Sequence, residues 1–324
     1  MRRAWLCAVA LAVLVGSAER ICFAQISPPD VARADALYKD GKFKESIALL
    51  DAYLRSHPQD ATAFVARGDD YEAMNKQEAA IADYTAALAI NAQYAYAWAS
   101  RCESYYEIDE SSSAMKDCNR AIELDPKMTY AYRFRALVNL DQGSDQAALA
   151  DADRAISLSP NGARNLTARC RAYIALEKYD NAVNDCNAAT AIDPTSDDAY
   201  FYRGRAEIAQ QKWSAAAVDL AKALKLNPGD TNAYYWLTKA LMAQGAYPDA
   251  LRTVDLYIQS DVDDADGHFM RAQIEEKLGD ADQARISATN AQRHYMIVND
   301  QAGAAKAQAL LDSLGKPSPS AVPP

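Results

Sequence analysis

Four cysteines carry the most specific chemistry that this sequence offers. Cys102 and Cys118 lie 16 residues apart, and Cys170 and Cys186 repeat the same interval. Cysteines held close together in an oxidising compartment form disulfides, so the spacing predicts the pairs Cys102–Cys118 and Cys170–Cys186. Two alternatives stay open, namely four free thiols buried as small core residues or a zinc site. No histidine neighbours either pair, so we expect no bound metal.

Residues 1–24 predict export to such a compartment. Two arginines precede an apolar run over residues 4–16, and the small residues Cys22 and Ala24 precede a cleavage site after Ala24. Cleavage after Ala18 is the weaker option. The apolar run is shorter than the roughly 20 residues that span a bilayer, which argues against an uncleaved anchor. We therefore expect an exported protein, periplasmic or secreted, with no membrane insertion after cleavage.

The charge balance and the absence of catalytic motifs exclude several functions. The chain has 34 Lys and Arg against 44 Asp and Glu, a net charge of −10, which lacks the basic footprint of a nucleic-acid-binding protein. Its histidines, His57, His268 and His294, are scattered without ligand spacing. No phosphate-binding loop, nucleophile elbow or dinucleotide fingerprint occurs. The sequence thus predicts neither an enzyme nor a cofactor.

A fixed period must position these residues. Four prolines follow one another at intervals of 34 residues, at Pro126, Pro160, Pro194 and Pro228. Counting from Ser27 in this frame, small residues recur at positions 8, 20 and 27 of each interval, and large residues at positions 4, 11 and 24. Positions 4, 8 and 11 mark one face of a first helix, and positions 20, 24 and 27 mark one face of a second, so every interval predicts two helices joined by a turn. The predicted repeats are 27–60, 61–94, 95–128, 129–162, 163–196, 197–230, 231–264 and 265–298.

This pattern resembles the tetratricopeptide repeat, and the resemblance covers residues 27–298. The frame departs from the family pattern where Ala92, Val262 and Met296 replace the proline, and where Asn139 and Glu207 replace a large residue at position 11. The resemblance implies an all-α solenoid that forms a right-handed superhelix, in which the first helices line a groove that holds protein segments. We expect a capping helix over 299–314, covering the last repeat with Ala302, Ala305, Ala309 and Leu310, and a disordered Pro/Ser-rich tail over 315–324.

The frame also explains the cysteine spacing. Both pairs occupy positions 8 and 24 of their own repeat, on the first and second helix respectively. These helices run antiparallel, and their side chains tilt toward each helix's own N-terminus. The two thiols of each pair therefore lean toward each other.

A ladder of opposite charges runs beside the cysteines. Position 7 is arginine in seven of the eight repeats, and position 23 is aspartate in five. Repeat seven, which has lost the arginine, has also lost the aspartate. Pairing within a repeat leaves no aspartate without an arginine, so we expect bidentate pairs between the two helices of one repeat.

The predicted groove face separates charge by sign. Its predicted binding residues lie on the first helices, acidic toward one end and basic toward the other, with tyrosines among them: Asp69, Glu72, Glu103, Tyr106, Glu107, Tyr130, Arg133, Arg164, Arg171, Arg205, Tyr235 and Lys239. This separation predicts an extended ligand of bipolar charge in a wide, solvated groove. Chance variation on a solvated face is the alternative.

The sequence therefore predicts a non-catalytic scaffold or adaptor of the cell envelope that binds a protein or peptide partner in its groove. Two alternatives remain. The chain could be a structural component of an envelope assembly that uses its convex surface, or an enzyme with an unrecognised site. Nothing in the pattern predicts an oligomeric state.

Overall fold

A computed structural model describes residues 28–315, and this part of the chain is all-α. It forms 17 helices and contains no β-strand, which confirms the predicted α-solenoid. Its contacts divide it into a first unit, residues 28–178, and a second unit, residues 179–315. The predicted export signal and most of the predicted tail lie outside the described residues. Among the helices of residues 28–315, none is long and apolar enough to cross a membrane.

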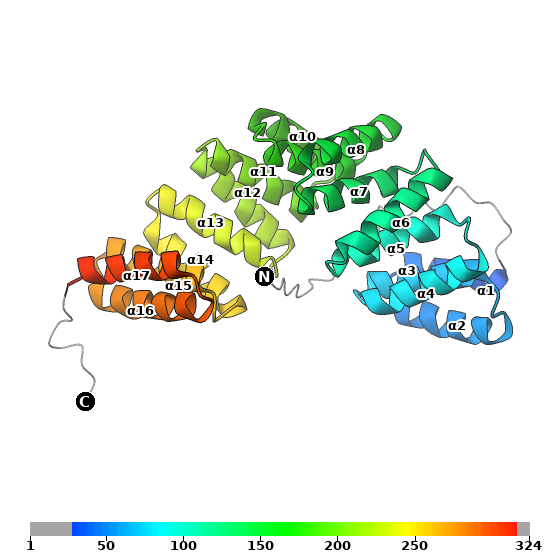
Figure 1. Ribbon diagram of the computed structural model, residues 1–324, viewed down its shortest axis with the longest axis horizontal. Coiled ribbons are helices and arrows are strands. Elements are labelled where there is room, and N and C mark those ends of the chain that lie inside the picture. Colours follow the sequence, from blue (N-terminus) through cyan, green and yellow to red (C-terminus); the bar gives the residue numbers. More distant parts are fainter. Residues whose placement is uncertain (1–27, 316–324) are drawn as a thin grey trace. The chain divides into compact units, whose positions relative to one another are not determined.

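The first unit is built from antiparallel helix pairs (Figure 1). Within it the odd-numbered helices contact the next odd-numbered helix, whereas the described even-numbered helices do not contact one another. The odd-numbered helices therefore form one layer. We call the surface of this layer that points away from the even-numbered helices the inner face. The helices are α1 (Pro29–Lys39), α2 (Phe43–Ser56), α3 (Ala61–Ala73), α4 (Gln77–Ile90), α5 (Ala95–Glu107), α6 (Ser111–Leu124), α7 (Thr129–Asp141), α8 (Asp145–Leu158) and α9 (Ala163–Ala175).

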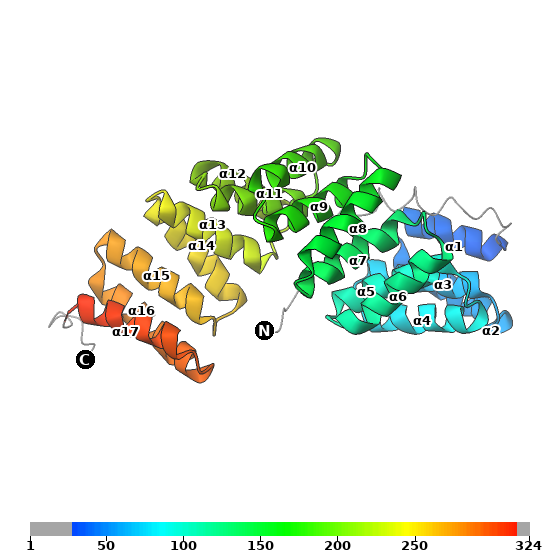
Figure 2. The same ribbon diagram turned by 45° about the horizontal axis from the view of Figure 1, so that its top comes forward.

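The second unit repeats this two-layer pattern, with α11, α13, α15 and α17 in contact in turn. Figure 2 shows α17 lying along α16 at the end of the described chain. The helices are α10 (Tyr179–Ile192), α11 (Asp197–Ala209), α12 (Trp213–Leu226), α13 (Thr231–Ala243), α14 (Tyr247–Ser260), α15 (Ala265–Leu278), α16 (Ala281–Ile297) and α17 (Gln301–Ser313).

The turn inside each helix pair depends on one left-handed residue. Position 15 of all eight repeats has a positive φ, and four of the eight residues there are glycine. The others are Asn75, Asp109, Glu177 and Gln211. A left-handed residue at this point ends the first helix and reverses the chain direction, so the turn geometry is the same whether or not glycine is present.

Positions 8 and 24 face each other in helix pairs of both units and vary in size together. Gly68 lies against the ring of Tyr84, where an added Cβ would sit 2.7 Å from Cε1. Gly204 lies in the same way against Leu220. In α7 and α8 the two positions are Ala136 and Ala152, both fully buried. The space between the two helices holds one large side chain at most, and where Tyr84 or Leu220 fills it from position 24, position 8 is glycine.

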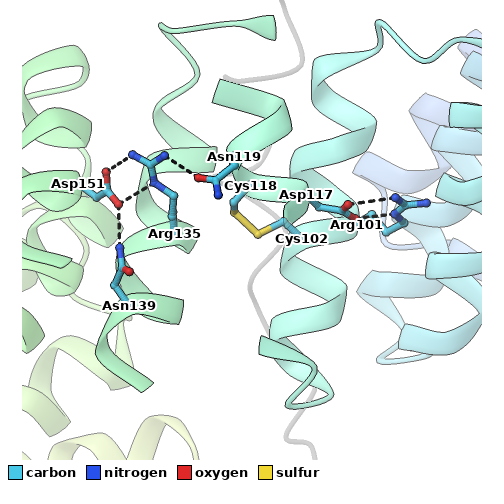
Figure 3. Close-up of a disulfide and its surroundings, with 8 residues drawn as sticks. All are labelled: Arg101, Cys102, Asp117, Cys118, Asn119, Arg135, Asn139 and Asp151. Carbon is cyan, nitrogen blue, oxygen red and sulfur yellow. Dashed lines mark hydrogen bonds and ion pairs between the residues drawn. A yellow bond between two sulfur atoms is a disulfide. The ribbon is translucent and has the colours of Figure 1, made fainter. Parts of the chain in front are cut away.

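Cys102 and Cys118 fill the same two positions in α5 and α6 and are joined by a disulfide, with Cα atoms 5.4 Å apart (Figure 3). Both side chains are fully buried. The other predicted pair, Cys170–Cys186, would join residues of different units, and this pairing stays a prediction.

The arginines at position 7 each join two repeats. Bidentate pairs within one repeat confirm the predicted ladder for Arg67–Asp83, Arg101–Asp117, Arg135–Asp151 and Arg203–Asp219, with N–O distances between 2.5 and 3.1 Å. The remaining guanidinium nitrogen reaches position 25 of the preceding repeat, as in Arg135 Nη1 to Asn119 Oδ1 at 2.8 Å (Figure 3). The sequence pattern did not predict this second contact. It fixes each repeat on its neighbour.

The capping helix exposes a different face from the one predicted. Gly303 and Ala307 are its buried residues, whereas Ala302, Ala305 and Ala309 are exposed and Leu310 is partly buried. The reason is that α16 continues to Ile297 and Asn299 is left-handed, so α17 begins at Gln301, two residues later than predicted.

Candidate functional site

The twelve predicted groove residues are divided between the two units. Nine of them, from Asp69 to Arg171, belong to the first unit, and Arg205, Tyr235 and Lys239 belong to the second. The environments of the two sets differ, so each is described by itself.

In the first unit, a tyrosine from the other helix layer binds the predicted groove acids. The Tyr84 hydroxyl lies 2.8 Å from Asp69 Oδ1 and 2.7 Å from Glu72 Oε2. Tyr96 donates to the other oxygen of Asp69 at 3.4 Å. Asp69 is only 5% exposed and Tyr84 is fully buried. Tyr84 reaches this place because Gly68 leaves room for its ring.

Glu103 extends this arrangement to α5. Glu72 and Glu103 are hydrogen-bonded to each other, and burial followed by the charge of Glu103 raises the pKa of Glu72 well above its ordinary value. Burial also raises the pKa of Glu103, against the opposing effects of the Glu72 hydrogen bond and the charges of Arg133 and Arg164. The Glu72–Glu103 pair therefore binds a proton more tightly than ordinary carboxyl groups do. We call Asp69, Glu72, Tyr84, Tyr96 and Glu103 the acid–tyrosine network.

Arg133 lies against two aromatic rings beside this network. Its guanidinium carbon is 4.9 Å from the ring centroids of both Tyr130 and Phe134, and the residue is only 7% exposed. At the boundary between the predicted acidic and basic residues, the charges of Arg133 and Arg164 act on Glu103. The predicted solvation is wrong for Asp69 and Arg133, which are buried.

Four of the predicted residues lie at the edge of this region. Arg171 Nη2 donates to the Tyr106 hydroxyl at 3.3 Å, which joins α9 to α5. Glu107, the last residue of α5, and Arg164, near the start of α9, are exposed. Most of the predicted set in the first unit thus binds other residues of the protein.

In the second unit, the predicted residues surround an indole instead. Arg205 and Lys239 each lie 4.7 Å from the ring of Trp236, and Lys239 also lies 5.2 Å from the ring of Tyr235. Lys239 is exposed, and within residues 28–315 it forms no ion pair. Its contacts with the protein are therefore cation–π contacts, which leave the ammonium group accessible to an anion.

A pocket of about 410 Å³ lies beside Lys239, and we call it the α13 pocket. Side chains of α11, α12, α13 and α15 line it: Ile208, Trp213, Tyr235, Lys239, Met242, Ala243, Asp266, Phe269, Met270 and Gln273. Asp266 also lines it and accepts a hydrogen bond from the Tyr295 hydroxyl at 2.5 Å. The sequence reasoning missed this pocket. It named Tyr235 and Lys239 but not the apolar residues between them and α15.

The second unit also contains one carboxyl group that titrates near neutrality. Burial raises the pKa of Glu207 to about 7, with a further increase from Asp219, while Arg203 and Lys212 oppose the shift. In the first unit Asn139 occupies the same repeat position and donates to Asp151 at 3.1 Å (Figure 3). Glu207 is thus the ionisable counterpart of a neutral donor. No group of three or more potential metal ligands is found in the described part of the chain.

Models of known families match three parts of the chain. Tetratricopeptide-repeat models match residues 31–96 and residues 207–274, one in each unit. The chain carries tetratricopeptide repeats. A model described as the ETO1 C-terminal domain matches residues 71–211. No curated protein matches this chain significantly.

Solved structures show the same fold at low sequence identity. A chain in the crystal structure of the APC/C hetero-tetramer Cut9-Hcn1 aligns with a TM-score of 0.71 and 14% identity over 89% of this tetratricopeptide chain, which spans 55% of that chain. Pseudomonas aeruginosa pilF aligns with a TM-score of 0.58 and 18% identity, over 66% of this chain and 96% of its own. A tetratricopeptide repeat protein from Parabacteroides merdae aligns with a TM-score of 0.52 and 15% identity, over 79% of this chain and 99% of its own. This fold is generally non-catalytic and suggests a protein–protein interaction scaffold.

Proposed function

We propose that the protein is an exported, non-catalytic scaffold that binds segments of partner proteins on the inner face of its second unit. The observation that carries the proposal is the α13 pocket. It opens among the first helices of consecutive repeats and combines apolar side chains with one exposed ammonium group and one carboxylate. An apolar pocket with few polar groups is the usual form of a specific binding site.

Export rests on a different observation. The Cys102–Cys118 disulfide is of the kind that persists in oxidising compartments such as the bacterial periplasm and the exterior. Together with the predicted signal over residues 1–24, it favours an envelope or secreted location. Intact-mass measurement of the protein from its native host tests this point. Loss of residues 1–24 and two hydrogens fewer per disulfide support export, whereas a full-length, fully reduced chain contradicts it.

A displayed library of random twelve-residue peptides tests segment binding. The proposal predicts peptides that bind the whole protein and lose affinity when Lys239 is replaced by glutamate. Lys222→Glu is the matched control, because Lys222 also lies near an aromatic ring, 5.7 Å from that of Tyr200, but does not line the pocket. If the library yields no binder, or only binders that tolerate Lys239→Glu, inner-face binding of segments is wrong.

The convex surface supports the alternative of a structural assembly component. Large apolar side chains are exposed on α12 and α16, among them Val218 at 69% and Ile297 at 71%. Under that alternative, polar substitutions at these two residues would abolish capture of a partner, while Lys239→Glu would leave capture unchanged. Under our proposal the opposite result is expected.

A further inference from the structure

The α13 pocket has a chemical composition that specifies what it binds. We infer that it takes one large apolar side chain of an extended partner segment, with an acidic residue of that segment at Lys239 and a basic residue at Asp266. This inference rests on the proposed function, because it assumes that the inner face of the second unit binds protein segments.

The interior of the pocket favours an apolar and adaptable contact. Ile208, Met242, Phe269 and Met270 provide aliphatic, thioether and aromatic surface from three different helices. Methionine side chains are flexible and polarisable, so they fit apolar groups of several shapes. A volume of about 410 Å³ lies in the range of about 300–1,000 Å³ that is usual for ligand pockets. A large aliphatic or aromatic side chain therefore gains the most by entering.

The two borders of the pocket carry opposite charges that do not pair with each other. Lys239 on α13 contacts the rings of Tyr235 and Trp236, and Asp266 on α15 accepts from Tyr295. Among the ion pairs of residues 28–315, none joins Lys239 to Asp266. A ligand that places a carboxylate at one border and a cation at the other satisfies both groups at once.

The carboxylate is assigned to a side chain of the segment rather than to a chain terminus. A side-chain carboxylate and a terminal carboxylate carry the same two oxygens, so the course of the chain beyond the pocket decides between them. Here one ammonium group borders the pocket, and Arg205 lies 4.7 Å from the Trp236 ring without lining the pocket. A single acidic side chain beside the apolar residue suits this arrangement, and the opposite charge at Asp266 requires the segment to continue past the pocket.

Fluorescence polarisation with defined peptides tests the inference on the full mature protein. The probe is a labelled peptide that carries Glu-Gly-Phe-Gly-Lys within a Gly/Ser background, with both ends blocked. Three comparison peptides are measured beside it. In the first, Phe is replaced by Gly; in the second, both charged residues are replaced by Gln; the third ends in a free carboxylate after Phe. We expect the blocked probe to bind at least tenfold more tightly than its Gly version and at least threefold more tightly than its Gln version.

Two pairs of protein variants locate the site. Ala243→Phe fills the pocket from its edge, and Ala175→Phe is the matched control, since Ala175 is also the exposed last residue of a first helix at the same repeat position but lies in the first unit. Lys239→Gln removes the cation, with Lys222→Gln as its control. We expect Ala243→Phe to weaken probe binding at least tenfold, and Lys239→Gln to abolish the preference for the charged probe. Both controls should bind like the wild type, and circular dichroism confirms folding of all four.

The failure of this inference is distinguishable from the failure of the proposed function. If peptides from the displayed library bind but Ala243→Phe leaves their affinity and that of the probe unchanged, the pocket assignment is wrong and segment binding stands. If the free-carboxylate peptide binds and the blocked probe does not, the side-chain assignment is wrong. If neither library nor probe peptides bind, both proposals are overturned.

Discussion

The inner faces of the two units use equivalent repeat positions for different purposes. At position 9, Glu103 of the first unit is bound within the acid–tyrosine network, whereas Lys239 of the second unit borders the α13 pocket. At position 5, Arg133 is buried against two rings, whereas Tyr235 lines the pocket. A charged side chain on the first helix of a tetratricopeptide repeat therefore does not by itself indicate a binding surface. The neighbouring side chains, Glu72 for Glu103 and two rings of α7 for Arg133, decide whether that side chain is bound internally.

The disulfide should have the largest effect on stability, and it acts on the first unit. Replacing Cys102 and Cys118 together by alanine should lower the free energy of unfolding by about 3 kcal/mol, the chain-entropy value for a closed loop of about 17 residues. Alanine at both positions is already tolerated in α7 and α8, so the double variant isolates the covalent bond. Urea unfolding measures the change. Peptide binding at the α13 pocket should be unaffected, and a parallel loss of binding would contradict the division between the units.

Loss of a hydrogen bond in the acid–tyrosine network should have the second largest effect on stability. Tyr84→Phe removes the hydroxyl that lies within hydrogen-bond distance of both Asp69 and Glu72. One buried carboxyl oxygen then loses its donor, at a cost of about 1–3 kcal/mol. Tyr132→Phe is the control, because the Tyr132 hydroxyl forms no hydrogen bond within the described residues. Thermal unfolding of both variants decides the matter. Equal melting temperatures would mean that the network does not stabilise the first unit.

Glu207 should make a smaller, pH-dependent contribution to the free energy of unfolding of the second unit. Its folded pKa of about 7 lies above the ordinary value of 4.5, so the folded state binds the proton more tightly than the unfolded state. The contribution of Glu207 to the free energy of unfolding is therefore fully present below about pH 4.5 and is lost as the pH rises through about 7. Because Glu207 is partly exposed, we expect about 1 kcal/mol rather than the full linkage value.

Glu207→Gln isolates this term, since glutamine remains a neutral donor as Asn139 is beside Asp151. Denaturant unfolding at pH 8 and pH 5 should show the variant more stable than the wild type at pH 8, with the difference disappearing at pH 5. Asn139→Asp should introduce a similar pH dependence in the first unit. A difference between Glu207→Gln and wild type that is the same at both pH values would contradict the assignment.

Much of the fold could be predicted because a period determines which residues share a helix face. The proline interval predicted the helix pairs, and the joint loss of Arg and Asp in repeat seven predicted pairing within a repeat. The same reasoning failed for Asp69, because a period does not show whether a long side chain from the other helix reaches the same face. It failed for Arg133 because a period does not show whether rings of the same helix lie against the guanidinium group. Gly68 opposite Tyr84 was the available signal, since glycine at position 8 makes room for a large ring at position 24.

The site was less predictable than the fold for a related reason. A pocket depends on side chains from several helices leaving a volume unfilled. Ile208 and Met242 come from position 12 of two successive repeats, and Phe269 from position 5 of the next. The face of α17 was mispredicted because one longer helix, α16, moved the start of the next by two residues. Both errors arise where the exact repeat gives way to local packing.

The comparison is tested most directly by substituting the same repeat position in each unit. Glu103→Ala and Lys239→Ala should be measured side by side for free energy of unfolding in urea and for affinity to the blocked Glu-Gly-Phe-Gly-Lys probe. We predict that Glu103→Ala lowers stability by about 1–3 kcal/mol and leaves probe affinity unchanged, whereas Lys239→Ala leaves stability within about 0.5 kcal/mol and weakens binding at least threefold. If Glu103→Ala weakens binding while Lys239→Ala does not, the assignment of a structural role to one face and a binding role to the other is wrong.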